Sequence, residues 1–261
     1  MTDLLKQLEQ IKKTAAERHE KHTRKALCEV HQSEYIEDNR TASGNYEGEC
    51  PLCKTERESA AMAELANLRR IKRIKQSGLP PRFHDRTLES YKATNPRQQS
   101  ALEAVKSYVA DLDGLRNGRS LLMIGNVGVG KTHFAAGVIN ELVKPDNKFD
   151  AVYTTARDMI RDIRSTWKNP DRDESEAIDH YAKTSLLVID EVGVQYGSES
   201  EAILMFDVID KRYGSRLPTV FISNLKMAEV KAILTDRIID RLREDNGLTV
   251  QLEWTSQRGA A

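Results

Sequence analysis

The chain has 261 residues, of which 39% are hydrophobic and 31% are charged, a composition typical of a soluble protein with one sizeable domain and a smaller one. Its 40 basic and 40 acidic residues cancel, which excludes an overall charge that would draw it to nucleic acid, so any such binding must come from local patches. No apolar run approaches the ~20 residues of a membrane span, and residues 1–13 lack a signal-peptide core, so we expect a cytoplasmic protein without a membrane partner.

The N-terminal residues predict a helix followed by a loop-rich module. Between Asp3 and Lys25, apolar residues recur every three or four positions, as on one face of a helix. The following stretch, from Cys28 to Cys53, has little helical periodicity and contains several glycine, serine and asparagine residues. We therefore expect loops in this stretch.

The same stretch carries two pairs of residues spaced as metal ligands. Two residues separate Cys28 from His31, and two separate Cys50 from Cys53. Together they supply the four tetrahedral ligands that structural zinc prefers, and Zn²⁺ would replace the apolar core that so short a segment cannot build. The alternative is three unligated cysteines in a histidine-rich neighbourhood, since three cysteines cannot all pair as disulfides.

A second N-terminal helix is predicted at 56–75, and it ends in a basic run. Residues 69–75 hold five cations and no acid, a pattern that could bind DNA phosphates or an acidic partner but also occurs at solvated helix ends. Two prolines at 80–81 stop this helix and mark a linker. We expect a mainly helical, zinc-bearing domain at 1–78 and a second domain at 79–261.

Beyond the linker, apolar strands alternate with helices. The predicted strands are at 120–124, 151–154, 186–190 and 219–223. The predicted helices are at 96–112 and 131–143, in a charged stretch that ends near Tyr181, and at 200–213. Such alternation indicates an α/β fold with a parallel sheet covered by helices on both faces.

Residues 125–132 form the most specific motif. They match G-x-x-x-x-G-K-[ST] between a strand and a helix, where backbone amides and the helix N-terminus cradle phosphates. The motif consists of Gly125, Asn126, Val127, Gly128, Val129, Gly130, Lys131 and Thr132, and we include His133 in the nucleotide contact. Lys131 is expected to reach the β- and γ-phosphates and Thr132 to ligate Mg²⁺. The motif predicts a site for ATP and ADP.

A second motif lies at the end of the strand 186–190. Asp190 at the strand tip can hold Mg²⁺ through water, and Glu191 is placed to polarise a water molecule for attack on the γ-phosphate. Acids at strand ends are common in α/β proteins, so this motif is informative because a phosphate-binding loop precedes it. The two motifs together predict an ATPase.

Two later features each allow two interpretations. Asn224 follows the strand 219–223 and could orient the attacking water, or it could be an ordinary turn residue. Three arginines, Arg237, Arg241 and Arg243, could include one that reaches a neighbouring subunit's γ-phosphate, or they could form a solvated helical face. The residues alone do not decide between these interpretations.

Taken together, the motifs resemble those of the DnaC family of replicative helicase loaders, which are AAA+ ATPases related to the transposition protein IstB. The resemblance rests on the phosphate-binding loop, the strand ending in Asp190 and Glu191, the strand ending at Asn224, and the segments 236–243 and 252–258. It implies an AAA+ fold that self-associates. Too few residues follow Asn224 for a full helical lid, so we expect the lid to be missing or vestigial.

The resemblance also implies roles and partners. Asn224 would be sensor 1, Arg241 the arginine finger offered to the adjacent subunit, and Arg258 sensor 2. An N-terminal region would bind a DnaB-type replicative helicase hexamer, while the AAA+ domain would hold single-stranded DNA. The chain would thus be an ATP-dependent helicase loader in DNA replication. The alternatives are an IstB-like transposition ATPase and an adaptor that binds nucleotide with little turnover.

Three residues are candidates for DNA contact. The segment 156–182 takes the position of the family's initiator-specific helix, and its Trp167 could stack on bases or could be a buried anchor of that helix. Ser198 and Ser200 lie where the family touches backbone phosphates, although the chain lacks the family's aromatic residue at the second position.

Overall fold

The computed structural model describes residues 10, 12–13, 23–38, 47–147, 149–193 and 199–256. The chain divides into two compact units, Met1–Asn67 and Leu68–Ala261. The helix predicted at 3–25 extends too far, because its last three residues belong to strand β1, Thr23–Leu27. Residues 10, 12 and 13 are helical, and the rest of that prediction lies outside the described residues.

The first unit contains an antiparallel hairpin that the sequence analysis did not predict. β1 pairs with β2, Glu34–Asp38, and ion pairs across the strands join Arg24 to Glu37 at 2.6 Å and Lys25 to Glu34 at 2.9 Å. Both strands are short, charged and largely exposed. They therefore lack the apolar alternation by which a half-buried strand is recognised in a sequence.

Helix α2, Pro51–Gln76, starts earlier than predicted, with a proline at its first position, where the missing N–H needs no partner. Its C-terminal end belongs to the second unit. There Arg70 donates to the Asn140 side chain at 3.0 Å, and Arg73 donates to the Val143 carbonyl at 3.4 Å. Two cations of the basic run therefore anchor this helix end, and they are not free for an external partner.

The second unit is built on a parallel sheet with strand order β4-β5-β6-β3-β7. The strands are β3 (Leu121–Gly125), β4 (Ala151–Thr155), β5 (Leu186–Asp190), β6 (Thr219–Ser223) and β7 (Leu248–Leu252). β5 and β6 coincide with their predicted ranges because they are buried along their whole length. β7 was not predicted, although its residues alternate between apolar and polar and the last three alternate between buried and exposed, which is the pattern of a half-buried strand.

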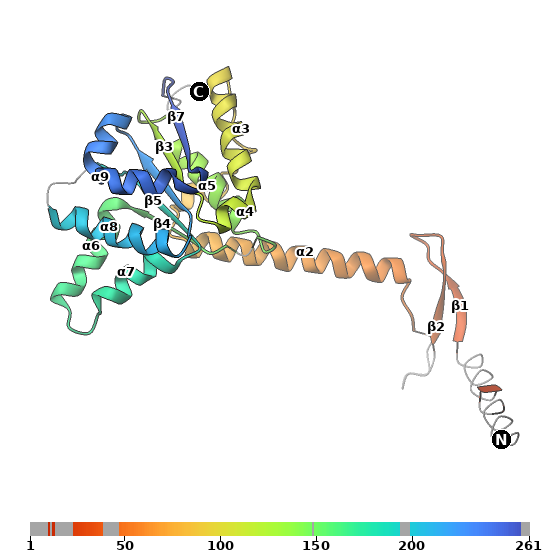
Figure 1. The fold of residues 1–261 in the computed structure, drawn as a ribbon. Helices are drawn as coiled ribbons and strands as arrows, with labels where there is room; N and C mark the ends of the chain where they lie inside the picture. Colours follow the sequence, from red (N-terminus) through yellow and green to blue (C-terminus); the bar gives the residue numbers. More distant parts are fainter. Residues whose placement is uncertain are drawn as a thin grey trace, which may run out of the picture. The chain divides into compact units, whose positions relative to one another are not determined.

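Helices cover both faces of this sheet (Figure 1). One core cluster includes α3 (Pro96–Ala110) and α5 (Lys131–Leu142), and the other includes α6 (Ala156–Ser165), α7 (Glu174–Lys183), α8 (Glu199–Gly214) and α9 (Met227–Arg243). Successive strand residues alternate between the clusters, so that Val188 lies in the first and Ile189 in the second. The predicted α/β fold is confirmed.

The end of the described chain contains little helix. After α9 come a single 3-10 turn at Glu244–Asn246 and then β7, and no described residue beyond β7 is helical. This agrees with the expected missing or vestigial lid. Among the helices that the structure describes, none is both long and apolar enough to cross a membrane.

Candidate functional site

The phosphate-binding loop joins β3 to α5 at the carboxyl edge of the sheet. Gly130, which precedes α5, has a φ of 103°, and a Cβ there would lie 2.9 Å from the Tyr91 ring. A Cβ at Gly125 would lie 2.3 Å from the carbonyl oxygen of Leu252 in β7. Glycine is therefore required at both positions, because neighbouring segments press directly on the loop backbone.

Lys131 is held inside this loop. The side chain is only 6% exposed, and its Nζ donates hydrogen bonds to the carbonyl oxygens of Gly125 and Asn126, both at 2.7 Å. The ammonium group lies beside the positive N-terminal end of α5. A buried cation next to a helix N-terminus is an arrangement suited to a polyphosphate.

His133 contacts a different part of the chain. Its Nε2 lies 3.0 Å from the Thr87 carbonyl oxygen and 3.2 Å from the Ser90 hydroxyl, and its ring meets the Tyr91 ring edge-on. Burial lowers the pKa of His133, which favours the neutral ring with Nε2–H donating to the carbonyl. His133 thus ties the segment before α3 to the start of α5, and its predicted nucleotide contact stays a prediction.

The two predicted magnesium ligands lie together. The Thr132 hydroxyl donates to Asp190 Oδ2 at 3.1 Å, and the Asp190 side chain is 6% exposed. A hydroxyl and a carboxylate at hydrogen-bond distance offer the oxygen donors that Mg²⁺ prefers. The same oxygen of Asp190 accepts a hydrogen bond from the Tyr153 hydroxyl at 2.6 Å, a contact that the sequence analysis missed.

Glu191 has an unusual backbone conformation at the end of β5. Its φ is 58°, in the left-handed region that residues other than glycine rarely adopt. The next residue, Val192, is buried and donates its N–H to the Ile222 carbonyl at 2.9 Å, which fixes the chain after the turn. Glu191 is exposed at the sheet edge, and its predicted role in polarising water stays a prediction.

Asn224 and the phosphate-binding loop line one cavity of about 740 Å³. Residues 225–228, the C-terminal end of β7 and the residues after β7, among them Trp254, also line this cavity. The Trp254 indole N–H donates to the Val129 carbonyl of the loop at 3.0 Å. The structure thus brings Asn224 to the loop, and it adds Trp254 as a contact that sequence reasoning missed.

The Arg241 side chain contacts residues of its own chain at the edge of the core. The guanidinium group forms an ion pair with Asp210 and lies 4.7 Å from the Phe206 ring centre and 5.2 Å from the Tyr213 ring centre. Arg237 and Arg243, on the same helix, are exposed. Arg258 lies outside the described residues. The roles expected for Arg241 and Arg258 therefore stay predictions.

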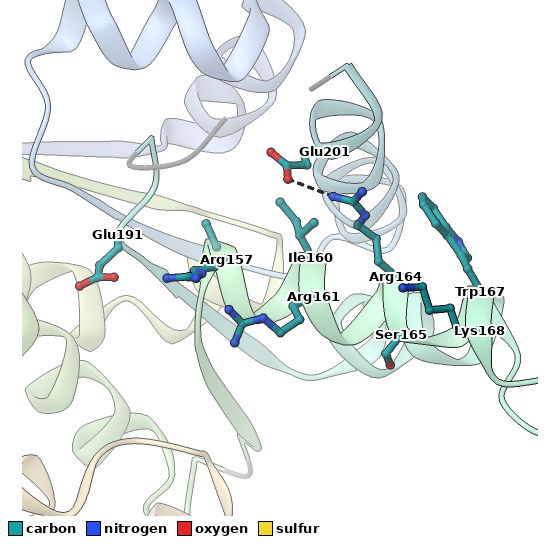
Figure 2. A pocket seen from close by; sticks show the side chains of 10 residues that line it. Arg157, Ile160, Arg161, Arg164, Ser165, Trp167, Lys168, Glu191 and Glu201 are labelled. Carbon is teal, nitrogen blue, oxygen red and sulfur yellow. Dashed lines mark hydrogen bonds and ion pairs between the residues drawn. The ribbon is translucent and has the colours of Figure 1, made fainter. Parts of the chain in front are cut away.

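A cationic groove runs along α6 (Figure 2). The cavity of about 550 Å³ is lined by Arg157, Arg161, Arg164, Trp167 and Lys168, together with Glu191 and Glu201. Trp167 is 53% exposed, which excludes its role as a buried anchor, and the Arg164 guanidinium lies 5.4 Å from its ring centre. Ser200 is partly buried at the start of α8, and Ser198 lies outside the described residues.

The four predicted zinc ligands lie together in the first unit, and their ligand atoms are all within 4.8 Å of one another. His31 Nδ1 is 3.6 Å from the Cys28 sulfur, 3.8 Å from the Cys50 sulfur and 3.3 Å from the Cys53 sulfur. Tetrahedral zinc, with bonds of about 2.3 Å to sulfur and 2.0–2.1 Å to nitrogen, places its ligand atoms roughly 3.5–3.8 Å apart. The cluster therefore has the dimensions of a zinc site.

Neighbouring side chains orient these ligands. The Glu56 carboxylate lies 3.0 Å from Nε2 of His31, which leaves Nδ1 to face the sulfurs. The Ser33 hydroxyl lies 3.5 Å from the Cys50 sulfur, and this hydrogen bond, followed by those from the Cys53 and Leu52 backbone, lowers the pKa of the Cys50 thiol to about 6. A lowered pKa favours the thiolate, which is the form that binds metal.

A Cys50→Ser variant should lose most of its bound zinc. The wild-type chain is expected to carry one zinc ion, and removal of one of the four ligands leaves an incomplete site. Metal analysis of the purified protein measures the zinc-to-protein ratio. His180→Ala, which removes an exposed histidine of the second unit, should keep the full ratio, whereas a full ratio in Cys50→Ser would refute this ligand set.

Two comparisons of sequence identify relatives of the chain. Residues 54–258 match the family model described as IstB-like ATP binding protein. The replicative helicase loader DnaC of Escherichia coli strain K12 is 32% identical over 202 residues, which cover 77% of this chain and 81% of that protein. The DnaC of Buchnera aphidicola subsp. Schizaphis graminum is 28% identical over 220 residues, which cover 82% of this chain and 88% of that protein.

Solved structures share the fold at lower sequence identity. The crystal structure of the DnaC helicase loader has a TM-score of 0.59 at 21% identity, covering 66% of this chain and 99% of that chain. The replication initiator DnaA bound to AMPPCP and single-stranded DNA has a TM-score of 0.56 at 24% identity, covering 68% of this chain and 51% of that chain. These likenesses concern the parallel α/β fold alone.

Proposed function

Since this chain belongs to the family of IstB-like ATP-binding proteins and is related to DnaC helicase loaders, we propose that it is an ATP-dependent loader of a DnaB-type replicative helicase. In this proposal it places the helicase hexamer on single-stranded DNA during replication. The observation that carries it is the similarity to E. coli DnaC, which spans 77% of this chain and 81% of that protein. The AAA+ fold fits the same role.

Nucleotide binding would use the loop and the acids at the sheet edge. Lys131, held inside the loop, would contact the β- and γ-phosphates of ATP. Thr132 and Asp190, 3.1 Å apart, would hold Mg²⁺, which would neutralise charge on the phosphates. Glu191 would then polarise the attacking water, with Asn224 beside the loop to orient it.

The site would be completed by a second subunit. Arg241 would approach the γ-phosphate of the adjoining protomer and stabilise negative charge in the transition state. To do so, it would leave its ion pair with Asp210 and the rings of Phe206 and Tyr213. ATP hydrolysis in isolated subunits would therefore be slow, and ATP binding would favour assembly.

Single-stranded DNA would lie in the groove along α6. In Figure 2, Arg157 and Arg161 extend toward the side where Glu191 lies, and Trp167 lies in the 3-10 turn Thr166–Lys168 that follows α6. Cations can track the phosphates while an exposed aromatic ring stacks on a base. Since Glu191 lines the same cavity, DNA in the groove would lie next to the group that polarises water.

Helicase binding would use the first unit. Large apolar side chains are exposed there on the hairpin and on α2, among them Val30 at 76%, Ile36 at 61% and Met62 at 74%. Exposed apolar groups of this kind mark surfaces that associate with a partner. Zinc at the Cys28 cluster would brace the turn that presents Val30.

Deletion of residues 1–67 should abolish co-elution with a DnaB-type hexamer from the native host. The full chain with Mg²⁺ and ATP is expected to co-elute with the helicase in size-exclusion chromatography. The deletion removes the first unit and retains the C-terminal end of α2 that anchors to the second unit, so ATP binding should persist. Intact helicase binding by the deleted protein would contradict the proposed surface.

The runner-up function is that of an IstB-like transposition ATPase, which the family model favours as much as it favours a loader. Such a protein would share the ATP site but would act on duplex DNA with a transposase. The co-elution experiment separates the two, because a transposition ATPase has no reason to bind a replicative helicase.

A further inference from the structure

Tyr153 lies in the middle of β4, an edge strand of the sheet, beside the strand that ends in Asp190. β4 and β5 are parallel, and Tyr153 pairs with Val188 while Thr155 pairs with Asp190. Tyr153 and Asp190 are therefore diagonal neighbours, and side chains two residues apart on a strand share a face. A tyrosine is long enough to span this diagonal, and its hydroxyl donates to Asp190 Oδ2 at 2.6 Å.

The hydrogen bonds of the Asp190 carboxylate show what Tyr153 contributes. Oδ2 accepts from both the Tyr153 and Thr132 hydroxyls, and Oδ1 accepts the backbone N–H of Glu191 at 2.7 Å. Each carboxylate oxygen has about two acceptor positions, so Oδ2 is filled and Oδ1 keeps one. If Thr132 turns its hydroxyl oxygen to a metal ion, Tyr153 is the side chain that continues to fix the plane of the carboxylate.

Tyr153 is itself held firmly. Its backbone N–H donates to the Ser77 carbonyl at 2.6 Å, so the turn that follows α2 occupies the open side of the edge strand. Gly78 in that turn has a φ of 82°, and a Cβ there would lie 2.8 Å from the Tyr153 carbonyl oxygen. The Tyr153 ring also packs against the core cluster that contains α3 and α5. Because the Tyr153 side chain is held in place, its hydroxyl can hold the Asp190 carboxylate in one orientation.

We propose that Tyr153 is a positioning residue of the magnesium site, which holds the Asp190 carboxylate in the orientation that receives Mg²⁺ with the nucleotide. This inference rests on the proposed function, because it takes Asp190 and Thr132 as the groups that hold the ion. It adds a residue from outside both nucleotide-binding motifs. Groups that orient metal ligands in this way commonly change metal affinity about 10–100-fold when they are removed.

The test compares Tyr153→Phe with the wild-type full-length protein. Binding of a fluorescent ATP analogue is titrated with Mg²⁺, and binding is also measured in EDTA. We expect the Mg²⁺ concentration for half-maximal binding to rise roughly 10-fold or more in the variant, while affinity in EDTA stays unchanged. The Mg²⁺ dependence of ATP hydrolysis should shift by a similar factor.

Tyr181→Phe is the matched control. It removes the same hydroxyl oxygen from another partly buried tyrosine–aspartate pair, because the Tyr181 hydroxyl donates to Asp162 at 3.0 Å in the α6–α7 region. The Mg²⁺ titration of this variant should match that of the wild type. A purely structural role for Tyr153 would lower the melting temperature without nucleotide and leave the Mg²⁺ midpoint unchanged, and that result would overturn the inference.

Asp190→Asn separates failure of this inference from failure of the proposed function. If Asp190→Asn shifts the Mg²⁺ midpoint and Tyr153→Phe does not, the carboxylate holds the ion and Tyr153 does not position it. If neither variant shifts the midpoint, Asp190 itself is not a magnesium ligand and the proposed site is wrong. A shift in both variants, with no shift in Tyr181→Phe, supports the inference.

Discussion

Arg241→Ala is expected to lower the ATPase rate of the assembled protein by roughly 10³-fold while leaving ATP binding close to wild type, as loss of a trans-acting arginine does in related phosphoryl transfers. The reason is that the guanidinium group stabilises charge that develops only in the transition state. Steady-state hydrolysis at protein concentrations that permit assembly measures the ATPase rate. Equilibrium titration measures the affinity for ATP.

Mixing experiments test whether Arg241 acts in trans. Arg241→Ala subunits keep their own nucleotide site, whereas Lys131→Ala subunits keep Arg241 but lack the loop lysine. Neither variant should hydrolyse ATP alone, and a mixture should recover part of the activity, because one neighbour supplies the arginine to the other's site. A mixture that stays inactive, at concentrations where the subunits assemble, would contradict the shared site.

Two controls separate catalysis from folding. Asp210→Asn breaks the ion pair within the chain but keeps Arg241, so a purely structural role predicts the same loss of activity in this variant. The catalytic role predicts retained activity in Asp210→Asn. Arg243→Ala removes an exposed arginine from the same helix and should change the rate little.

Glu191→Gln should lower ATP hydrolysis about 10²–10⁴-fold with ATP binding retained, which is the usual contribution of a residue that activates the attacking water. Glutamine has nearly the same shape and can keep the left-handed backbone turn, but it cannot take a proton from water. Single-turnover hydrolysis of bound ATP is the direct measurement. Hydrolysis that persists at the wild-type rate would favour another base.

Glu201→Gln is a matched control for Glu191→Gln, because both carboxylates line the groove along α6 and only one follows β5. Glu201 pairs with Arg164 at 3.1 Å, so its loss should alter the charge of the groove without removing the base.

The pair of variants also tests the adaptor alternative. For an adaptor that binds nucleotide with little turnover, the slow hydrolysis of the wild-type chain would not fall in Glu191→Gln.

The sequence predicted those strands and loops whose pattern lies within a few consecutive residues. β5 and β6 are apolar runs buried throughout, and the loop between β3 and α5 follows a contiguous pattern, so each could be placed within a residue or two. The hairpin β1–β2 lacks such a signal, whereas the edge strand β7 carries a short apolar–polar alternation that the sequence analysis did not use. Their pairing depends on ion pairs and on partners distant in the chain, such as β3 for β7.

The same distinction holds for the candidate site. Thr132 belongs to the phosphate-binding loop, and that loop made the acid at the end of β5 a candidate magnesium ligand; the structure places Thr132 and Asp190 3.1 Å apart. Tyr153 lies outside every motif, and Trp254 lies in the segment 252–258, for which no contact with the loop was predicted; both contacts depend on strand order and register, which the sequence did not reveal. Knowing that β4 lies beside β5 is the signal that would have found Tyr153.

The contacts between β7 and the phosphate-binding loop also constrain when the nucleotide site can form during synthesis. The Leu252 carbonyl lies against Gly125, and the Trp254 indole N–H donates to the Val129 carbonyl, although about 125 residues separate the partners of each contact in the chain. A ribosome adds roughly 5–20 residues per second, so the loop leaves the ribosome many seconds before the strand that supports it. A nascent chain therefore carries the complete loop sequence without the complete site, which can form only after β7 has been synthesised.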